Sequence, residues 1–303
     1  PRLFDAYIMV DWSASSVPTR SKDSIWVGVL DSHSDGEVSF DAVNPETRLL
    51  ARKLIEDVVA RRTLRGDRVL LGFDFSLGYP AGTAEALGLD TKTCAPWTAM
   101  YSYLAANFQD QPDNSNQRFI QAAAMNARIS NRAYPFWGTP PKFQSATLSA
   151  KKGGNTRPNT LPEYRATERY LREHHNGQPK SCWQLYGAGA VGSQSLLGIP
   201  HIHALRESLP NSRIWPFETG FEKLDEDALE DIKIVIAEIY PSILEARPEP
   251  GEVKDKAQVR AIARHYYDLD DKGDLGAAFA PPNSLDRREI RQAEVEEGWI
   301  LGK

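Results

Sequence analysis

The chain has 303 residues, of which 41% are hydrophobic, 25% charged and 10% aromatic, and these ordinary globular values exclude a disordered, fibrous or collagen-like protein. No apolar run approaches the roughly 20 residues of a membrane span, and no signal-peptide pattern opens the sequence, so we expect a cytoplasmic protein without membrane contact. The formal net charge of −5 argues against a dedicated nucleic-acid coat protein, because such proteins neutralise phosphates with clustered Lys and Arg.

The first third of the chain predicts three short strands, a helix and a buried strand. Apolar, β-branched and aromatic residues separated by turn formers predict strands at residues 5–10, 24–30 and 38–40. Apolar residues three and four apart predict a helix over residues 45–62. Residues 69–73 form a continuous apolar run, which is typical of a strand in the middle of a sheet that is covered on both faces.

The pattern changes to loops and helices between about residues 80 and 210. The expected helices in this stretch cover residues 97–108, 119–129 and 163–174. A strand follows at residues 233–239, and two more helices are expected at residues 256–267 and 275–280. This order predicts an α/β fold in a single domain of residues 1–303, with a long insertion at about 80–210.

Carboxylates stand at the ends of three predicted strands. Asp11 follows the first strand, Asp74 follows the buried fourth strand, and Glu238 lies at the end of the late one. Because sites in open parallel sheets lie beyond the carboxyl ends of the strands, we expect these acids to converge. Converging carboxylates bind a divalent cation or share a proton, and oxygen ligands without histidine favour Mg²⁺ or Mn²⁺.

A further acidic pair, Asp271 and Asp274, opens the last predicted helix and is expected to complete the site from the C-terminal side. Any one of these acids could equally cap a helix or end a strand for solubility. Their recurrence at strand ends is what favours a shared functional site.

The element order is that of the ribonuclease-H-like fold, and several short motifs resemble domain-of-unknown-function family 429. The motifs are VDWS (residues 10–13), GFDFSLGYP (72–80), VGSQ (191–194), LGIP (197–200) and AEIYP (237–241). Members of that family are described as predicted ribonuclease-H-like nucleases. The resemblance implies a mixed sheet of three antiparallel strands plus parallel strands, flanked by helices.

The resemblance also implies a set of site residues. Asp11, Asp74, Glu238 and one of Asp271 or Asp274 would surround a divalent metal ion. The stretch DLGAA (274–278) only approximates the family's helix pattern, so the choice between Asp271 and Asp274 stays open.

Substrate contacts are expected from a basic middle segment. Residues 115–180 hold 11 Lys and Arg against 3 Asp and Glu, a net charge of +8. Within it, Arg128 and Arg132 alternate with aromatic rings, and Lys151 and Lys152 follow in a loop, a combination that binds single-stranded nucleic acid. The alternative is a buried aromatic knot at residues 136–141 beside solvated lysines.

A glycine-rich loop offers a second contact. Gly187, Gly189 and Gly192 match the dinucleotide fingerprint, but Gly198 to Pro200 should interrupt the helix behind it, which disfavours NAD binding. We expect instead that the loop approaches an anion or the metal, with Ser193 and Gln194 as hydrogen-bond donors. A tight turn alone would also require these glycines.

Together these features predict a Mg²⁺- or Mn²⁺-dependent nuclease or related phosphohydrolase. In the two-metal mechanism, ions about 3.5–4 Å apart activate a water and stabilise the departing oxygen of a phosphodiester. The substrate would be a nucleic acid, a nucleotide or a phosphorylated small molecule. Two alternatives remain, a non-catalytic nucleotide-binding or regulatory protein and an ATP-dependent phosphotransferase of the actin-like and sugar-kinase branch, although the chain has no duplicated half.

Overall fold

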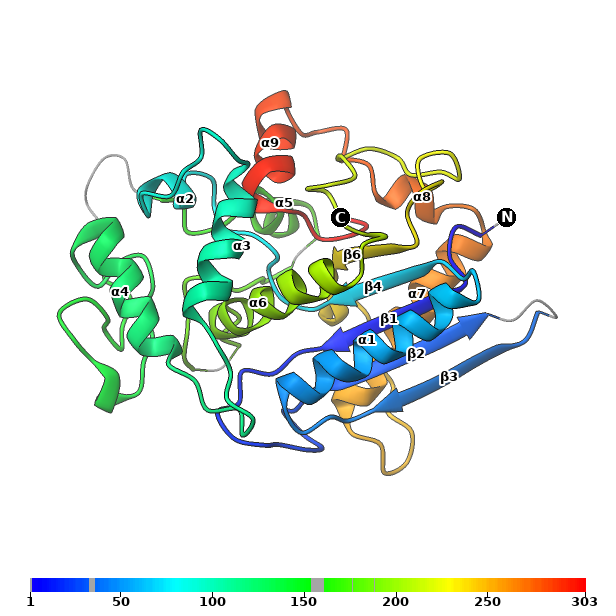
Figure 1. Cartoon of the computed structure of the whole chain (residues 1–303), viewed down its shortest axis with the longest axis horizontal. Helices are drawn as coiled ribbons and strands as arrows, with labels where there is room; N and C mark the ends of the chain where they lie inside the picture. The colour runs from blue at the N-terminus through cyan, green and yellow to red at the C-terminus, as the bar shows by residue number, and fades with distance from the viewer. Residues whose placement is uncertain (1, 33–35, 154–160, 176, 188) are drawn as a thin grey trace.

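The computed structural model describes residues 2–32, 36–153, 161–175, 177–187 and 189–303. Six strands of this described chain form one sheet in the order β3-β2-β1-β4-β6-β5 (Figure 1). They are β1 (Ala6–Asp11), β2 (Trp26–Ser32), β3 (Val38–Val43), β4 (Val69–Phe73), β5 (Ser212–Ile214) and β6 (Ile234–Glu238). Strands β1, β2 and β3 pair antiparallel, whereas β1, β4, β6 and β5 run parallel, so the expected mixed α/β sheet is confirmed.

Helices account for most of the remaining regular structure. They are α1 (Arg48–Leu64), α2 (Thr83–Ala86), α3 (Pro96–Asn107), α4 (Arg118–Ser130), α5 (Ala166–His174), α6 (Gly192–Ser208), α7 (Lys254–Asp271), α8 (Leu275–Ala278) and α9 (Arg287–Gln292). Three short turns complete them, namely η1 (Pro141–Phe143), η2 (Pro241–Ile243) and η3 (Ala293–Glu297). Within the described ranges, none of these helices has the length and apolar character needed to cross a bilayer.

Helices cover both faces of the sheet. In Figure 1, α1 and α6 lie in front of the sheet and α7 lies behind it. Alternation along β1 sends Ile8 and Val10 into the core beneath α1 and α6, and Tyr7 and Met9 into the core beneath α7. Burial on both faces explains why the central strands are continuous apolar runs.

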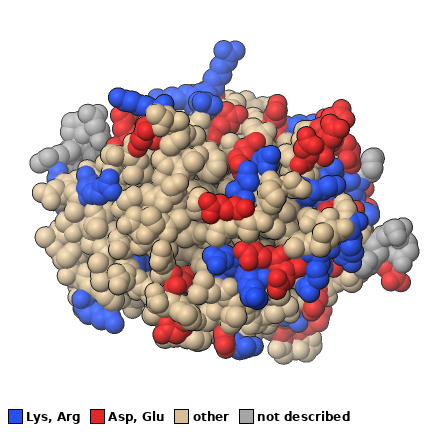
Figure 2. Space-filling model, in the orientation of Figure 1, with Lys and Arg blue, Asp and Glu red and all other residues tan. Residues whose placement is uncertain are grey.

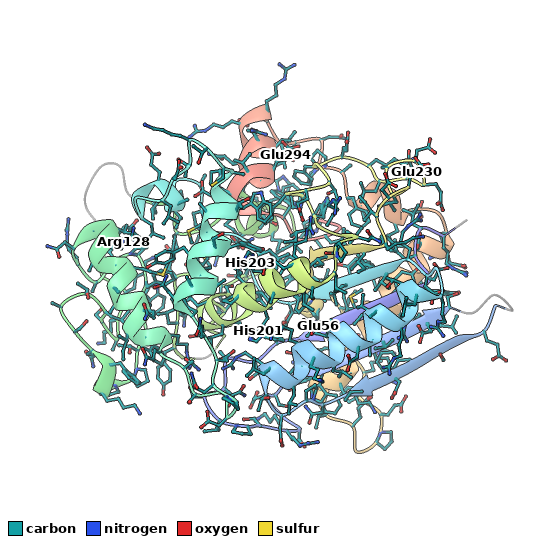
Figure 3. The ribbon with its side chains drawn as sticks, viewed as in Figure 1. Glu56, Arg128, His201, His203, Glu230 and Glu294 are labelled. Atoms are coloured by element: carbon teal, nitrogen blue, oxygen red, sulfur yellow. The ribbon has the colours of Figure 1, made fainter. Side chains whose placement is uncertain are left out.

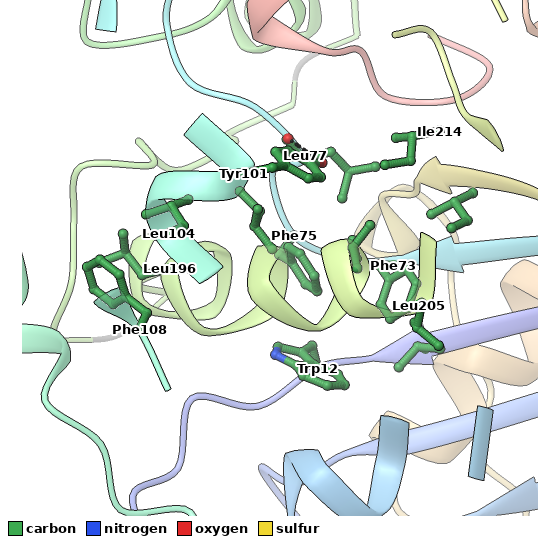
Figure 4. Packing of buried hydrophobic residues seen from close by; sticks show 14 of the residues in the cluster. Trp12, Phe73, Phe75, Leu77, Tyr101, Leu104, Phe108, Leu196, Leu205 and Ile214 are labelled. Carbon is green, nitrogen blue, oxygen red and sulfur yellow. Dashed lines mark hydrogen bonds between the residues drawn. The ribbon is translucent and has the colours of Figure 1, made fainter. Parts of the chain in front are cut away.

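The larger core lies between the sheet and helices α3 and α6, and Figure 4 shows Trp12, Phe73 and Phe75 packed beside α6. The Phe75 ring approaches Gly198 so closely that a Cβ at this glycine would lie 2.2 Å from it. Contrary to our expectation, α6 continues unbroken through Pro200. The proline removes one backbone hydrogen bond, but burial of the apolar side chains of α6 on either side of it holds the helix in place.

Candidate functional site

Asp11 and Asp74 lie side by side at the carboxyl edge of the sheet. β1 and β4 are parallel neighbours in the register Val10 to Phe73, so the next residue of each strand reaches the same point. The two carboxyl groups are hydrogen-bonded to each other, and Asp74 also accepts a hydrogen bond from the backbone N–H of Trp12 at 2.8 Å. Burial raises the pKa of Asp74 to about 7. Burial and then the charge of Asp74 raise the pKa of Asp11, so the pair shares a proton near neutral pH.

Two further acids face this pair. Asp255 comes from the first turn of α7 and Asp23 from the loop between β1 and β2, and both line the same cavity as the pair. The Asp255 carboxylate accepts a hydrogen bond from the backbone N–H of Asp23 at 2.8 Å. Both charges help to raise the pKa of Asp11, after burial and Asp74. Nothing in the sequence singles out Asp255, because an acid in the first turn of a helix is ordinary.

Asp271 and Asp274 lie at the opposite edge of the sheet, so their assignment to the site is wrong. α7 has 18 residues and is therefore about 27 Å long. It begins beside the loop that follows β1 and ends beside the chain that precedes β1, where Asp270 accepts hydrogen bonds from the backbone. Asp271 binds Arg2 at 3.1 Å instead, and neither it nor Asp274 lines the cavity. Because of the direction in which α7 runs, the acid in its first turn, Asp255, lies at the site, and Asp271 at its other end does not.

Glu238 lines the cavity but points to the other face of the sheet from the carboxyl pair. It is level with Phe73 in the register, one residue before Asp74, and strand side chains alternate between faces. Arg165 binds its two carboxylate oxygens at 2.8 and 2.6 Å, and the backbone N–H of Leu77 adds a bond of 3.0 Å. We therefore correct the assignment of Glu238 as a metal ligand, because a buried ion pair with Arg165, the residue before α5, already occupies its oxygens.

The acids line an open cavity of about 980 Å³ between the carboxyl edge of the sheet and the start of α6. Ser193 and Gln194 line it as expected, although both hold the protein's own backbone. Gln194 donates from its side-chain amide to the carbonyl of Trp12 at 2.7 Å. The hydroxyl of Ser193 donates to the carbonyl of Leu185 at 2.7 Å and accepts from Nε of Arg118 at 2.9 Å.

Arg118 is a half-buried cation of this cavity. In the described part of the chain no carboxylate lies within ion-pair distance of its guanidinium. It donates to the hydroxyls of Ser193 and Ser16, each at 2.9 Å, and to the amide oxygen of Asn116 at 3.1 Å. Burial lowers its pKa to about 10, which leaves it charged at neutral pH. A half-buried charge whose hydrogen-bond partners are all neutral is suited to meet an anion.

The other cations expected to bind substrate lie outside the cavity, contrary to that expectation. Arg128 lies on α4, at the edge of the view in Figure 3, with its guanidinium over a tyrosine ring of α3. Lys152 pairs with Glu163 beside a separate cavity of about 530 Å³. Arg132 and Lys151 are exposed elsewhere. Two cations of the basic segment do line the main cavity. They are Arg118 and Lys180, which lie near the two ends of that segment.

The surface in front of α1, α3 and α4 carries no extended basic stripe among the described residues in view. Figure 2 shows acidic and basic side chains intermixed over the half that carries α1, and few charged side chains over α3 and α4. The aromatic rings expected to stack on bases are also partly unavailable, because Phe136 is buried with its ring centroid 4.9 Å from that of Trp183. The buried aromatic knot is therefore the better description of that residue.

The carboxyl pair fits a divalent cation as two ligands. Across the described ranges, no three Asp, Glu, His or Cys side chains lie close enough together to hold a metal ion as they stand. The pKa values of Asp11 and Asp74 are both raised, however, so a cation that binds between them would displace a proton, and their oxygens are of the kind that Mg²⁺ and Mn²⁺ prefer. Asp255 is the further carboxylate whose charge acts on both members of the pair.

We compared the chain with protein-family models, with curated proteins and with solved structures, and none of the three comparisons found a match. The resemblance to domain-of-unknown-function family 429 therefore stays a prediction.

Proposed function

We propose that this chain is a Mg²⁺- or Mn²⁺-dependent phosphohydrolase that acts on a phosphate ester and has a ribonuclease-H-like fold. The observation that carries the proposal is the hydrogen-bonded carboxyl pair, Asp11 and Asp74, in a cavity that also holds the unpaired cation Arg118. The sheet order, with a three-strand antiparallel meander continued by parallel strands from β1, supports the fold assignment.

Each residue of the cavity has a role in this proposal. Asp11 and Asp74 would hold the cation, with Asp255 as the third carboxylate. When bound, such a cation polarises a phosphoryl group and stabilises the charge that develops on it. Arg118 would bind the phosphate oxygens, and the N-terminus of α6 adds a favourable field for an anion. Glu238 and Arg165 support the site from the other face of the sheet.

A second candidate is a nucleotide-binding protein without turnover. It is favoured by the fact that only two carboxylates of the described chain are in contact at the site. Two ligands suffice for a cation that bridges protein and phosphate, whereas hydrolysis needs a fuller set of groups around the reacting water.

Calorimetric titration of Mn²⁺ into the full chain tests the proposal, with wild type, Asp11→Asn and Asp274→Asn compared. Asp274→Asn is a matched control, because this acid lies at the far edge of the sheet. We expect wild type and the control to bind alike, and Asp11→Asn to lose at least about tenfold in affinity, equivalent to about 1.4 kcal/mol. Hydrolysis of an oligonucleotide or a nucleotide should disappear in the same variant.

Three results would decide otherwise. If wild type binds no Mn²⁺, or if Asp11→Asn binds it as well as the control does, the proposed site is wrong. If Mn²⁺ binds through Asp11 but none of the phosphate esters is hydrolysed, the second candidate replaces the first.

A further inference from the structure

We propose that the cavity takes a nucleotide unit whose base stacks on Tyr186 and whose phosphate meets Arg118 and Lys180. The inference deepens the proposed function by naming the substrate class, and it rests on that function only in placing the phosphate beside Asp11 and Asp74. The shared chemistry is an aromatic base joined to a phosphate, either in a free nucleotide or at the end of a single strand.

The first observation is an exposed aromatic ring at the cavity. Tyr186 is 53% exposed, and it is the one aromatic residue among the exposed large hydrophobic side chains of the described chain. It lines the cavity that holds the carboxyl pair. An aromatic ring with an open face stacks on any base, because every base has a π face, and Tyr and Trp rings are the usual platforms for this contact.

The second observation is that the backbone of Tyr186 packs closely against Gly138 although its ring is exposed. Gly138 has a φ of +86°, and a Cβ there would lie 2.9 Å from the nitrogen and 3.0 Å from the oxygen of Tyr186. The preceding residue, Leu185, donates its N–H to the carbonyl of Trp137 at 2.9 Å. A platform that is already fixed in place loses little conformational entropy when a ligand binds. This packing also gives a reason for the glycine in the sequence Phe136-Trp137-Gly138.

The third observation is that Arg118 and Tyr186 both lie next to the ring of Phe119. The guanidinium of Arg118 lies over the Phe119 ring, 4.5 Å from its centroid, and the same ring is 6.3 Å from that of Tyr186. Phosphate and base sites that both adjoin one ring match a ligand in which a single sugar joins the two groups. A sugar phosphate or inorganic phosphate would use Arg118 but leave Tyr186 without a role.

Lys180 adds a second cation beside the platform. It lines the cavity, and it makes no ion pair within the described residues. Its side chain runs along Gly189, where a Cβ would lie 3.2 Å from Cε of the lysine. The cavity volume of about 980 Å³ is at the upper end of small-molecule sites, which run from about 300 to 1,000 Å³. It therefore admits a nucleotide together with a cation.

Calorimetric titration of the full chain tests the inference with three probes, namely inorganic phosphate, AMP and the single-stranded trinucleotide of thymidine. Each titration is run in EDTA and again with Ca²⁺. Tyr186→Ala should weaken AMP binding at least about fivefold, the effect of losing one base stack, and should leave the affinities for inorganic phosphate and Mn²⁺ unchanged. Tyr186→Phe should bind AMP within about twofold of wild type, because it keeps the π face.

Two more variants separate the base from the phosphate. Arg118→Gln should weaken both AMP and inorganic phosphate. Tyr103→Ala is the aromatic control, because Tyr103 is a half-buried ring of α3 that does not line the cavity, and it should behave as wild type. Thermal unfolding of each variant confirms that it is folded.

The outcomes separate this inference from the proposed function. If Tyr186→Ala binds AMP as tightly as wild type, or if AMP and the trinucleotide bind no better than inorganic phosphate, the inference is overturned while the Mn²⁺ result still judges the hydrolase. If AMP binding depends on Tyr186 in a protein that binds no Mn²⁺, the inference stands and the proposed function fails. Tighter binding of AMP identifies a free nucleotide, and tighter binding of the trinucleotide identifies a strand end.

Discussion

Gln194 of α6 and Asp74, the residue that follows β4, are joined through the backbone of one residue, Trp12. The N–H of Trp12 donates to Asp74 at 2.8 Å, and its carbonyl accepts from the side chain of Gln194 at 2.7 Å. The ring of Trp12 is buried in the core, so the peptide groups between these two contacts cannot move freely. The start of α6 and the carboxyl pair are therefore held in a fixed relation.

Gln194→Ala should weaken the connection between the start of α6 and the carboxyl pair. We expect the free energy of unfolding to fall by about 0.5–1.5 kcal/mol, the usual value of one hydrogen bond, and Mn²⁺ affinity to fall with it. Urea unfolding and Mn²⁺ titration measure the two effects. Gln117→Ala is the control, because Gln117 is exposed and its side chain does not cap α4. Equal Mn²⁺ affinity in both variants would show that Gln194 does not position Asp74.

Mn²⁺ binding should depend on pH. Burial raises the pKa of Asp74 to about 7, and Asp11 shares its proton, so a cation must displace this proton in order to bind. Affinity should rise between about pH 6 and pH 8 and then level off, with release of about one proton per ion. Titrations in buffers of different ionisation enthalpy measure the proton release. An affinity that stays constant over this range would rule out the shared proton.

The stability of the fold should fall on acidification because of a buried network at the start of α1. Arg48 donates from Nε to Asp110 at 2.7 Å, and His201 of α6, labelled in Figure 3, contacts the same carboxylate at 2.8 Å. Burial alone would raise the pKa of Asp110, but the hydrogen bonds from Arg48 and His201 outweigh it and leave the pKa below its usual value. Burial lowers the pKa of His201.

Both pKa values are lower in the folded chain than in the unfolded chain, so the unfolded chain takes up more protons as the pH falls. The stabilisation is complete above the unfolded pKa of His201, 6.5, and is lost first below that value and then below 3.8, the unfolded value of Asp110. Urea unfolding at a series of pH values measures the loss. Asp110→Asn should cost about 3–5 kcal/mol at neutral pH, because it leaves Arg48 buried without its partner. Higher stability at pH 5 than at pH 7 would contradict the assignment.

Glu238→Gln should destabilise the protein without weakening Mn²⁺ binding. The substitution removes a carboxylate that binds Arg165 through both oxygens, so we expect a loss of about 1.5–3 kcal/mol, the value of hydrogen bonds to a charged group. Titration of Mn²⁺ into the folded variant should give a wild-type dissociation constant. A large loss of affinity, comparable to that of Asp11→Asn, would restore Glu238 as a ligand.

The elements of the sheet were predicted well because their signals are local. Continuous apolar runs mark β1, β4 and β6, and three- and four-residue spacing marks α1 and α7. The extra strand β5 has only three residues, too few for an alternating pattern to be recognised.

What the sequence by itself determined is that Asp11 and Asp74 each stand at the end of an apolar strand, from which their approach is predicted. That β1 and β4 are parallel neighbours, which brings the two acids to the same edge, was decided by the fold. The choice of their neighbours was decided only by the tertiary structure. Asp255 and Asp271 lie near the two ends of one helix, and it is the direction in which α7 crosses the sheet that brings the first to the site. Likewise, a single residue of strand register turns Glu238 to the opposite face, toward Arg165. Helix direction and strand register depend on packing between residues that are far apart in the sequence, so a local pattern of residues does not predict them.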